Sequence, residues 1–82
     1  MSYELIPIYD HHKSFYGKAI VSSRYNKIYL HSYGTLVATI YEGRLIVYGT
    51  YSATTLRHIK EFIRQHGFPC GSKSFIESNY SL

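Results

Sequence analysis

The 82 residues of this chain are enough for one small domain with a single hydrophobic core. With 45% hydrophobic and 17% charged residues, the composition is typical of a globular protein rather than a disordered one. The net charge of +4 permits an acidic partner, such as nucleic acid or an acidic protein surface, and argues against a protein that imitates DNA through negative charge. The single cysteine, Cys70, excludes an internal disulfide framework.

Residues 1–17 are predicted to form an N-terminal arm and loop. Residues 3–9 are mostly apolar, but Pro7 cannot donate a backbone hydrogen bond, so this segment suits an edge strand or an extended arm. Residues 10–17 have the composition of a loop that leads into the first regular strand.

Residues 18–49 are predicted to form an antiparallel sheet of three or four strands. The strand-like segments are residues 18–24, 27–33, 35–41 and 44–48. The dipeptides Tyr25-Asn26 and Glu42-Gly43 predict turns, because Asn and Gly accept positive φ. Gly34 separates the second segment from the third, and the whole pattern indicates a meander.

Residues 52–67 predict the one helix of the chain. Ser52 suits the N-cap, because its hydroxyl can accept a hydrogen bond from the first turn, and Gly67 suits the residue that follows the last turn. An apolar stripe at helical spacing consists of Leu56, Ile59, Phe62 and Ile63. The other side of the helix is predicted to carry Arg57, Lys60, Glu61 and Arg64.

Residues 68–82 form a tail rich in Ser and Gly, in which Phe75, Ile76 and Tyr80 could dock on the domain or add a short strand. The chain is thus predicted to be a single α+β domain, residues 1–82. Its one C-terminal amphipathic helix packs on one face of the antiparallel sheet.

One helix covers one face of such a sheet and leaves the other face open. When Ile28, Leu30, Leu45 and Val47 point inward, alternation directs the intervening side chains outward. Exposed aromatic and cationic side chains can stack on unpaired bases and neutralise phosphates, but they also suit a dimer interface or an ordinary strand surface.

The predicted partner-binding set combines this open face with the basic side of the helix. It comprises Tyr29, His31, Tyr33, Arg44 and Tyr48 from the sheet, and Arg57, Lys60 and Arg64 from the helix. The helix cations suit contacts to phosphates or acidic side chains, although a solvated helix surface has the same composition.

The histidines and the cysteine do not predict a metal site, because none of them is paired at a diagnostic zinc-ligand spacing. We therefore expect no cofactor. The ligands of a zinc ion, if one were bound, would be His11 or His12 with His66 and Cys70.

The sequence also lacks a catalytic signature. Its five acidic residues include no paired carboxylates in a segment that suggests a cleft, and no Gly-rich phosphate loop is present. Nothing around Cys70 indicates an activated thiol. We expect a protein that is not an enzyme.

The N-terminus and the hydrophobic pattern predict a cytoplasmic protein. Residues 1–7 lack the basic segment and the long apolar run of a signal peptide. No segment approaches the roughly 18 apolar residues that a membrane span needs, so we expect no membrane contact.

Three segments resemble a family of small uncharacterised proteins from phages and mobile elements of low-GC Gram-positive bacteria. They are residues 13–19 (KSFYGKA), 32–38 (SYGTLVA) and 51–62 (YSATTLRHIKEF), within a resemblance that spans roughly residues 10–68. The resemblance assigns no activity and no role to any residue. Small phage proteins of this kind are often counter-defence factors, and several type II anti-CRISPR proteins bind the effector nuclease stoichiometrically.

The leading hypothesis is therefore a non-catalytic phage-derived inhibitor, most specifically an anti-CRISPR protein that binds a CRISPR nuclease in the host cell. One alternative is a nucleic-acid-binding accessory or regulatory protein, whose affinity would fall steeply as salt rises. A further alternative is a self-associating structural phage protein that buries the open face in a homodimer.

Overall fold

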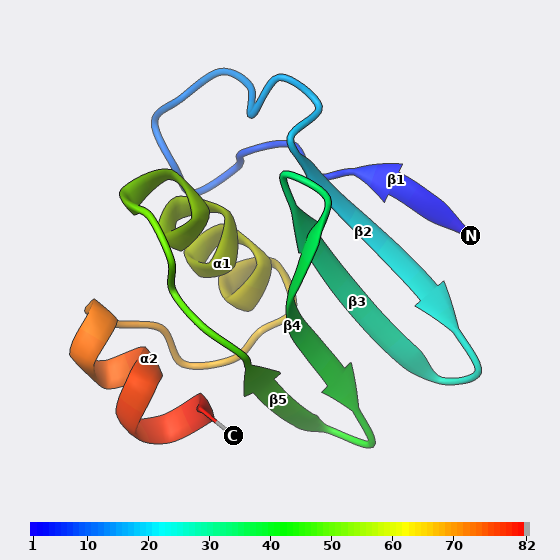
Figure 1. Ribbon diagram of the computed structural model, residues 1–82, viewed down its shortest axis with the longest axis vertical. Helices are drawn as coiled ribbons and strands as arrows, with labels where there is room; N and C mark the ends of the chain where they lie inside the picture. Colours follow the sequence, from blue (N-terminus) through cyan, green and yellow to red (C-terminus); the bar gives the residue numbers. More distant parts are fainter. Residues whose placement is uncertain (82) are drawn as a thin grey trace.

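The structure, a computed structural model, describes residues 1–81 and contains a five-stranded antiparallel sheet with two helices (Figure 1). The strands are β1 (Ser2–Glu4), β2 (Ala19–Arg24), β3 (Lys27–Ser32), β4 (Thr35–Tyr41) and β5 (Arg44–Val47). The helices are α1 (Ala53–Gln65) and α2 (Lys73–Tyr80). The strand order β1-β2-β3-β4-β5 follows the chain, which confirms the predicted α+β meander.

Three two-residue turns join the last four strands. Both residues of each turn have positive φ, the combination that a type I′ turn requires, and the turns are Tyr25-Asn26, Tyr33-Gly34 and Glu42-Gly43. The twist of this turn type matches that of the flanking strands, so it fixes their register. Because Tyr33 belongs to a turn, the predicted strand 27–33 ends one residue early, at Ser32.

The N-terminal residues supply a fifth strand that the sequence prediction of three or four strands did not include. Residues 3–9 were predicted as an edge strand or an extended arm, and the structure contains both: the first residues are in strand β1 and the later ones are in an arm. Residues as far as Glu4 pair with β2, and the chain then leaves the sheet as an arm that returns at Ala19. The pairing ends at Leu5, whose N–H donates to the carbonyl of Ala19 over 2.8 Å.

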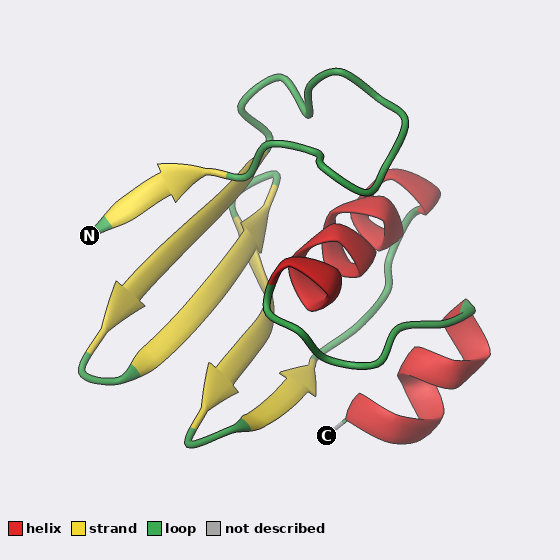
Figure 2. Ribbon diagram, turned by 180° about the vertical axis from the view of Figure 1, so that it is seen from behind, coloured by secondary structure: helices red, strands yellow, loops and turns green. Residues whose placement is uncertain are grey.

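Helix α1 lies across one face of the sheet, as Figure 2 shows from the helix side. Its N-cap is the predicted Ser52, whose Oγ accepts from the N–H of Thr55 over 3.2 Å. The predicted apolar stripe is directed at the sheet: Ile59, Phe62 and Ile63 are fully buried and Leu56 is half-buried.

Helix α2 was not predicted, because the tail shows no helical repeat of apolar residues. Ser72 caps the helix by accepting from the N–H of Phe75 over 3.3 Å. Only Ile76 is fully buried, whereas Phe75 stays partly exposed. A parallel bridge between Ser81 and Val47 places the tail beside β5, so the predicted docking of the tail is confirmed.

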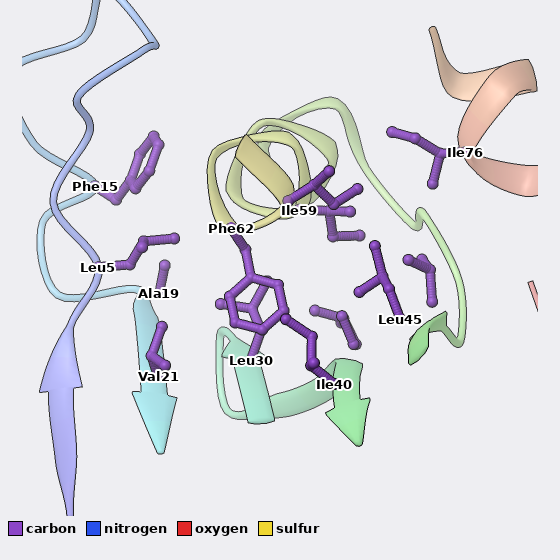
Figure 3. Packing of buried hydrophobic residues seen from close by; sticks show 14 residues of the cluster. Leu5, Phe15, Ala19, Val21, Leu30, Ile40, Leu45, Ile59, Phe62 and Ile76 are labelled. Carbon is purple, nitrogen blue, oxygen red and sulfur yellow. The ribbon is translucent and has the colours of Figure 1, made fainter. Parts of the chain in front are cut away.

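The core extends beyond the contact between α1 and the sheet. Figure 3 shows Phe62 and Leu30 at its centre, with Leu5 and Phe15 from the arm on one side. Leu45 and Ile76 close the opposite side. The arm and α2 therefore complete a core that one helix alone would leave open.

Candidate functional site

The outward side chains of the sheet form three cross-strand rows on the face that α1 does not cover. The histidine row consists of Glu4, Ile20, His31 and Leu36, the tyrosine row of Ser2, Ser22, Tyr29, Thr39 and Ile46, and the basic row of Arg24, Lys27, Tyr41 and Arg44. Within residues 1–81, no helix crosses this face (Figure 1 and Figure 2). We call it the open face.

The basic row lies at the end of the open face that is formed by two of the hairpin turns. Neighbouring side chains in such a row stand about 5 Å apart. The Nζ of Lys27 lies 4.9 Å from the centroid of the Tyr41 ring, and Arg24 lies over the neighbouring Tyr25 at 5.2 Å. The row has three cations, and Glu42 in the turn between Tyr41 and Arg44 is the acidic residue next to it, so the local charge is net positive.

The tyrosine row supplies the aromatic centre of the face. The hydroxyl of Tyr48, which follows β5, donates to Oγ1 of Thr39 over 3.1 Å. Thr39 is also the cross-strand neighbour of Tyr29, so the two tyrosines flank it. Tyr48 is 41% exposed and Tyr29 is half-buried, which leaves aromatic surface available to a partner.

The histidine row borders a hollow of about 390 Å³ at the other end of the open face. Ile20, His31 and Tyr33 line it together with Lys18. The open face therefore has a hollow at one end and a row of three cations at the other.

The structure brings together only part of the predicted partner-binding set. Four of its members lie on or over the open face: Tyr29, His31, Arg44 and Tyr48. Tyr33 instead lies in its turn at the end of the sheet, with its ring centroid 5.8 Å from that of His58 in α1.

The three helix cations, Arg57, Lys60 and Arg64, occupy the side of α1 opposite to its buried stripe. Because α1 covers the other face of the sheet, these cations and the open face lie on opposite sides of the domain. One flat partner surface cannot contact both. The predicted set also lacks Arg24, Lys27 and Tyr41, which the outward alternation includes when it is extended to the ends of the strands.

Glu61 is buried, contrary to its predicted place among the helix cations. Its carboxylate is 1% exposed and accepts from the N–H groups of Ile8 and Asp10, each over 2.9 Å. The N–H of Tyr9 and the Nε2 of Gln65 also donate to it, over 3.1 and 2.6 Å. Burial by itself raises the pKa of Glu61, but these hydrogen bonds outweigh burial, so its pKa lies below the ordinary value.

The four candidate zinc ligands do not meet. His12 lies beside Arg57 early in α1, at 3.2 Å between Nε2 and Nη1, whereas His66 caps the far end of that helix, about 13 Å away along its axis. Cys70 lies 3.9 Å from the carbonyl oxygen of Lys60. His11 groups instead with His12 and Asp10, but Asp10 already pairs with His12 over 2.6 Å beside the Arg57 cation.

Ser32 and His58 form a hydroxyl–imidazole pair, with 2.8 Å between Oγ and Nδ1. Ser32 is only 3% exposed and its hydroxyl also contacts Oγ1 of Thr55 at 3.0 Å. The pair therefore offers no nucleophile that a substrate can reach. Burial lowers the pKa of His58, partly opposed by the charge of Asp10.

The chain belongs to a family of unknown function, DUF8033, which matches residues 3–78. The match includes the whole open face and the arm that Glu61 holds. No curated protein and no solved structure matches the chain. None of the helices within residues 1–81 has the length and apolar character needed to cross a membrane.

Replacing Glu61 with Gln should release the arm. An amide cannot accept from three backbone N–H groups as a carboxylate does, so we expect a loss of about 1.5–3 kcal/mol in the free energy of unfolding. Hydrogen exchange of the amides of Ile8, Tyr9 and Asp10 should accelerate before the sheet opens. Glu42→Gln, in an exposed turn, is the matched control. Unchanged exchange at residues 8–10 would show that Glu61 does not hold the arm.

Stability should fall with acid in two stages. The pKa values of His58, Glu61 and Asp10 are all lowered in the folded state, the last chiefly by the N–H of His12. The unfolded chain therefore binds more protons, and stability is complete above the unfolded pKa of each group. Urea unfolding should show a first loss below pH 6.5, from His58, and a second below pH 4.5, from the carboxyl groups.

The variant His58→Gln should remove the first stage and keep the second. A wild-type stability that stays constant between pH 7 and about pH 5 would contradict the assignment of the first stage to this buried imidazole.

Proposed function

We propose that the protein is a non-catalytic binding protein that holds a partner macromolecule against its open face. The strongest support is that aromatic side chains, apolar side chains and three cations lie together on one uncovered face of the sheet. Tyr and Arg, together with Trp, are the residues most enriched at the energetic centres of protein interfaces.

The composition of the open face indicates the chemistry of its partner. The basic row requires an acidic counterpart, and the tyrosine row requires an apolar or planar one. The hydrogen bond from Tyr48 to Thr39 holds one aromatic side chain in place before binding, which lowers the entropy lost on association.

The partner that we propose first is a bacterial defence effector, specifically a type II CRISPR nuclease in a phage-infected cell. The resemblance of residues 13–19, 32–38 and 51–62 to small phage proteins supports this choice. Stoichiometric binding needs no catalytic residue. It requires only a surface that is complementary to the partner in shape and charge, as the open face could be. An acidic patch on the nuclease, with an apolar centre, is the expected contact.

Charge reversal on the two sides of the domain distinguishes the contact surface. The double variant Arg24→Glu/Arg44→Glu should weaken binding to the nuclease, and inhibition of its DNA cleavage, by at least about tenfold, because acidic groups would then face acidic groups. The matched control is Arg57→Glu/Arg64→Glu, which makes the same charge change on the outer side of α1. Equal losses in both variants would refute a specific role for the open face.

Single-stranded nucleic acid is the second candidate partner, favoured by the position of Tyr29 and Tyr48 beside the basic row. Three cations that contact phosphates predict a slope of about −2 for log K against log salt concentration. Fluorescence anisotropy with a labelled single strand measures this slope. Arg24→Gln/Arg44→Gln should reduce it to about −0.7, and binding without salt dependence would remove this candidate.

A further inference from the structure

A second hollow lies between the arm, the Tyr33 turn and the first half of α1, and it shares Lys18 and Tyr33 with the hollow beside the histidine row. Its volume is about 190 Å³, somewhat more than the roughly 150 Å³ of an apolar cavity that accepts benzene. Phe15, Tyr16 and Tyr33 provide aromatic walls, and Lys18 and Arg57 provide cations. No carboxylate belongs to its lining. We call it the arm cavity.

His58 lies at the inner wall of the arm cavity with an unused polar atom. Its side chain is fully buried, and its ring centroid lies 4.5 Å from that of Phe15 and 5.8 Å from that of Tyr33. Nδ1 is occupied by Ser32, but Nε2 has no hydrogen-bond partner within residues 1–81. A buried polar atom without a partner costs about 1–3 kcal/mol, which a ligand atom at this position would recover.

A chain of hydroxyl groups determines what His58 offers to a ligand. The hydroxyl of Ser52 donates to Oγ1 of Thr55 over 3.3 Å, and Thr55 lies 3.0 Å from Oγ of Ser32. When each hydroxyl donates to the next group, Ser32 donates to Nδ1 of His58. The imidazole proton then resides on Nε2, which becomes a hydrogen-bond donor.

We propose that the arm cavity binds a small carboxylate that carries a single aromatic ring. The carboxylate accepts from Nε2–H of His58 and is balanced by Lys18 and Arg57, and the ring packs between Phe15 and Tyr33. A phosphate would satisfy the cations but would leave the aromatic walls without a partner. No residue of the tyrosine or basic row lines the arm cavity, so ligand binding there can be tested apart from the proposed function.

Titration of the protein with benzoate, followed by NMR of ¹⁵N-labelled histidine, tests this site. Before titration, the nitrogen shifts of His58 should be those of the Nε2–H form. Benzoate should move the Nε2 signal and the ring protons of Phe15 and Tyr33 with a single saturating curve. Benzyl alcohol, which has the ring without the charge, and inorganic phosphate, which has the charge without the ring, should each bind at least about tenfold more weakly.

Two substitutions and one control locate the effect. Arg57→Gln should weaken benzoate binding about fivefold, whereas Arg64→Gln on the same helix should leave it unchanged. His58→Phe, checked for folding by thermal unfolding, should lose at least about tenfold. We expect a Kd of about 1 mM. The proposal is overturned if the chemical shifts of His58 do not change at benzoate concentrations up to about 50 mM. It is equally overturned if phosphate or benzyl alcohol binds as tightly as benzoate.

Discussion

The buried carboxylate of Glu61 is the interaction on which one side of this domain depends. It gathers three consecutive backbone N–H groups from the arm and ties them to the middle of α1. The arm brings Phe15 into the core and against His58. Without this tie, residues 8–10 would need other acceptors, the core would lose one of its sides, and the wall of the arm cavity would be displaced.

The rest of the architecture separates two surfaces with different chemistry. Four buried polar residues, His58, Ser32, Thr55 and Glu61, lie on the helix side of the sheet, whereas Thr39 is buried in the tyrosine row of the open face. The type I′ turns maintain the register of β2 to β5, so that cations separated by up to 20 residues in the chain fall into one row on the opposite side. The face that packs against α1 stabilises the fold, and the proposed recognition uses the opposite face of the same strands.

The sequence predicted the parts of the fold that repeat regularly. Strand alternation placed Tyr29, His31 and Arg44 correctly, and Ser52 and the apolar stripe located α1. Glu61 was misplaced because a carboxylate beside lysine and arginine has the pattern of a solvated surface, and its donors lie more than 50 residues away. Helix α2 and strand β1 are too short to show a period, and the hollow beside His58 arises from three segments that only the folded chain brings together.

Mapping the contact surface by NMR tests most directly whether the open face binds the proposed partner. The ¹⁵N-labelled protein would be mixed with a type II CRISPR nuclease at substoichiometric amounts, and loss of amide signal intensity would be measured along the chain. We predict losses concentrated in β2 to β5, with the outer residues of α1 unaffected. Losses centred on Arg57, Lys60 and Arg64, or no losses at all, would show that the open face does not bind the nuclease.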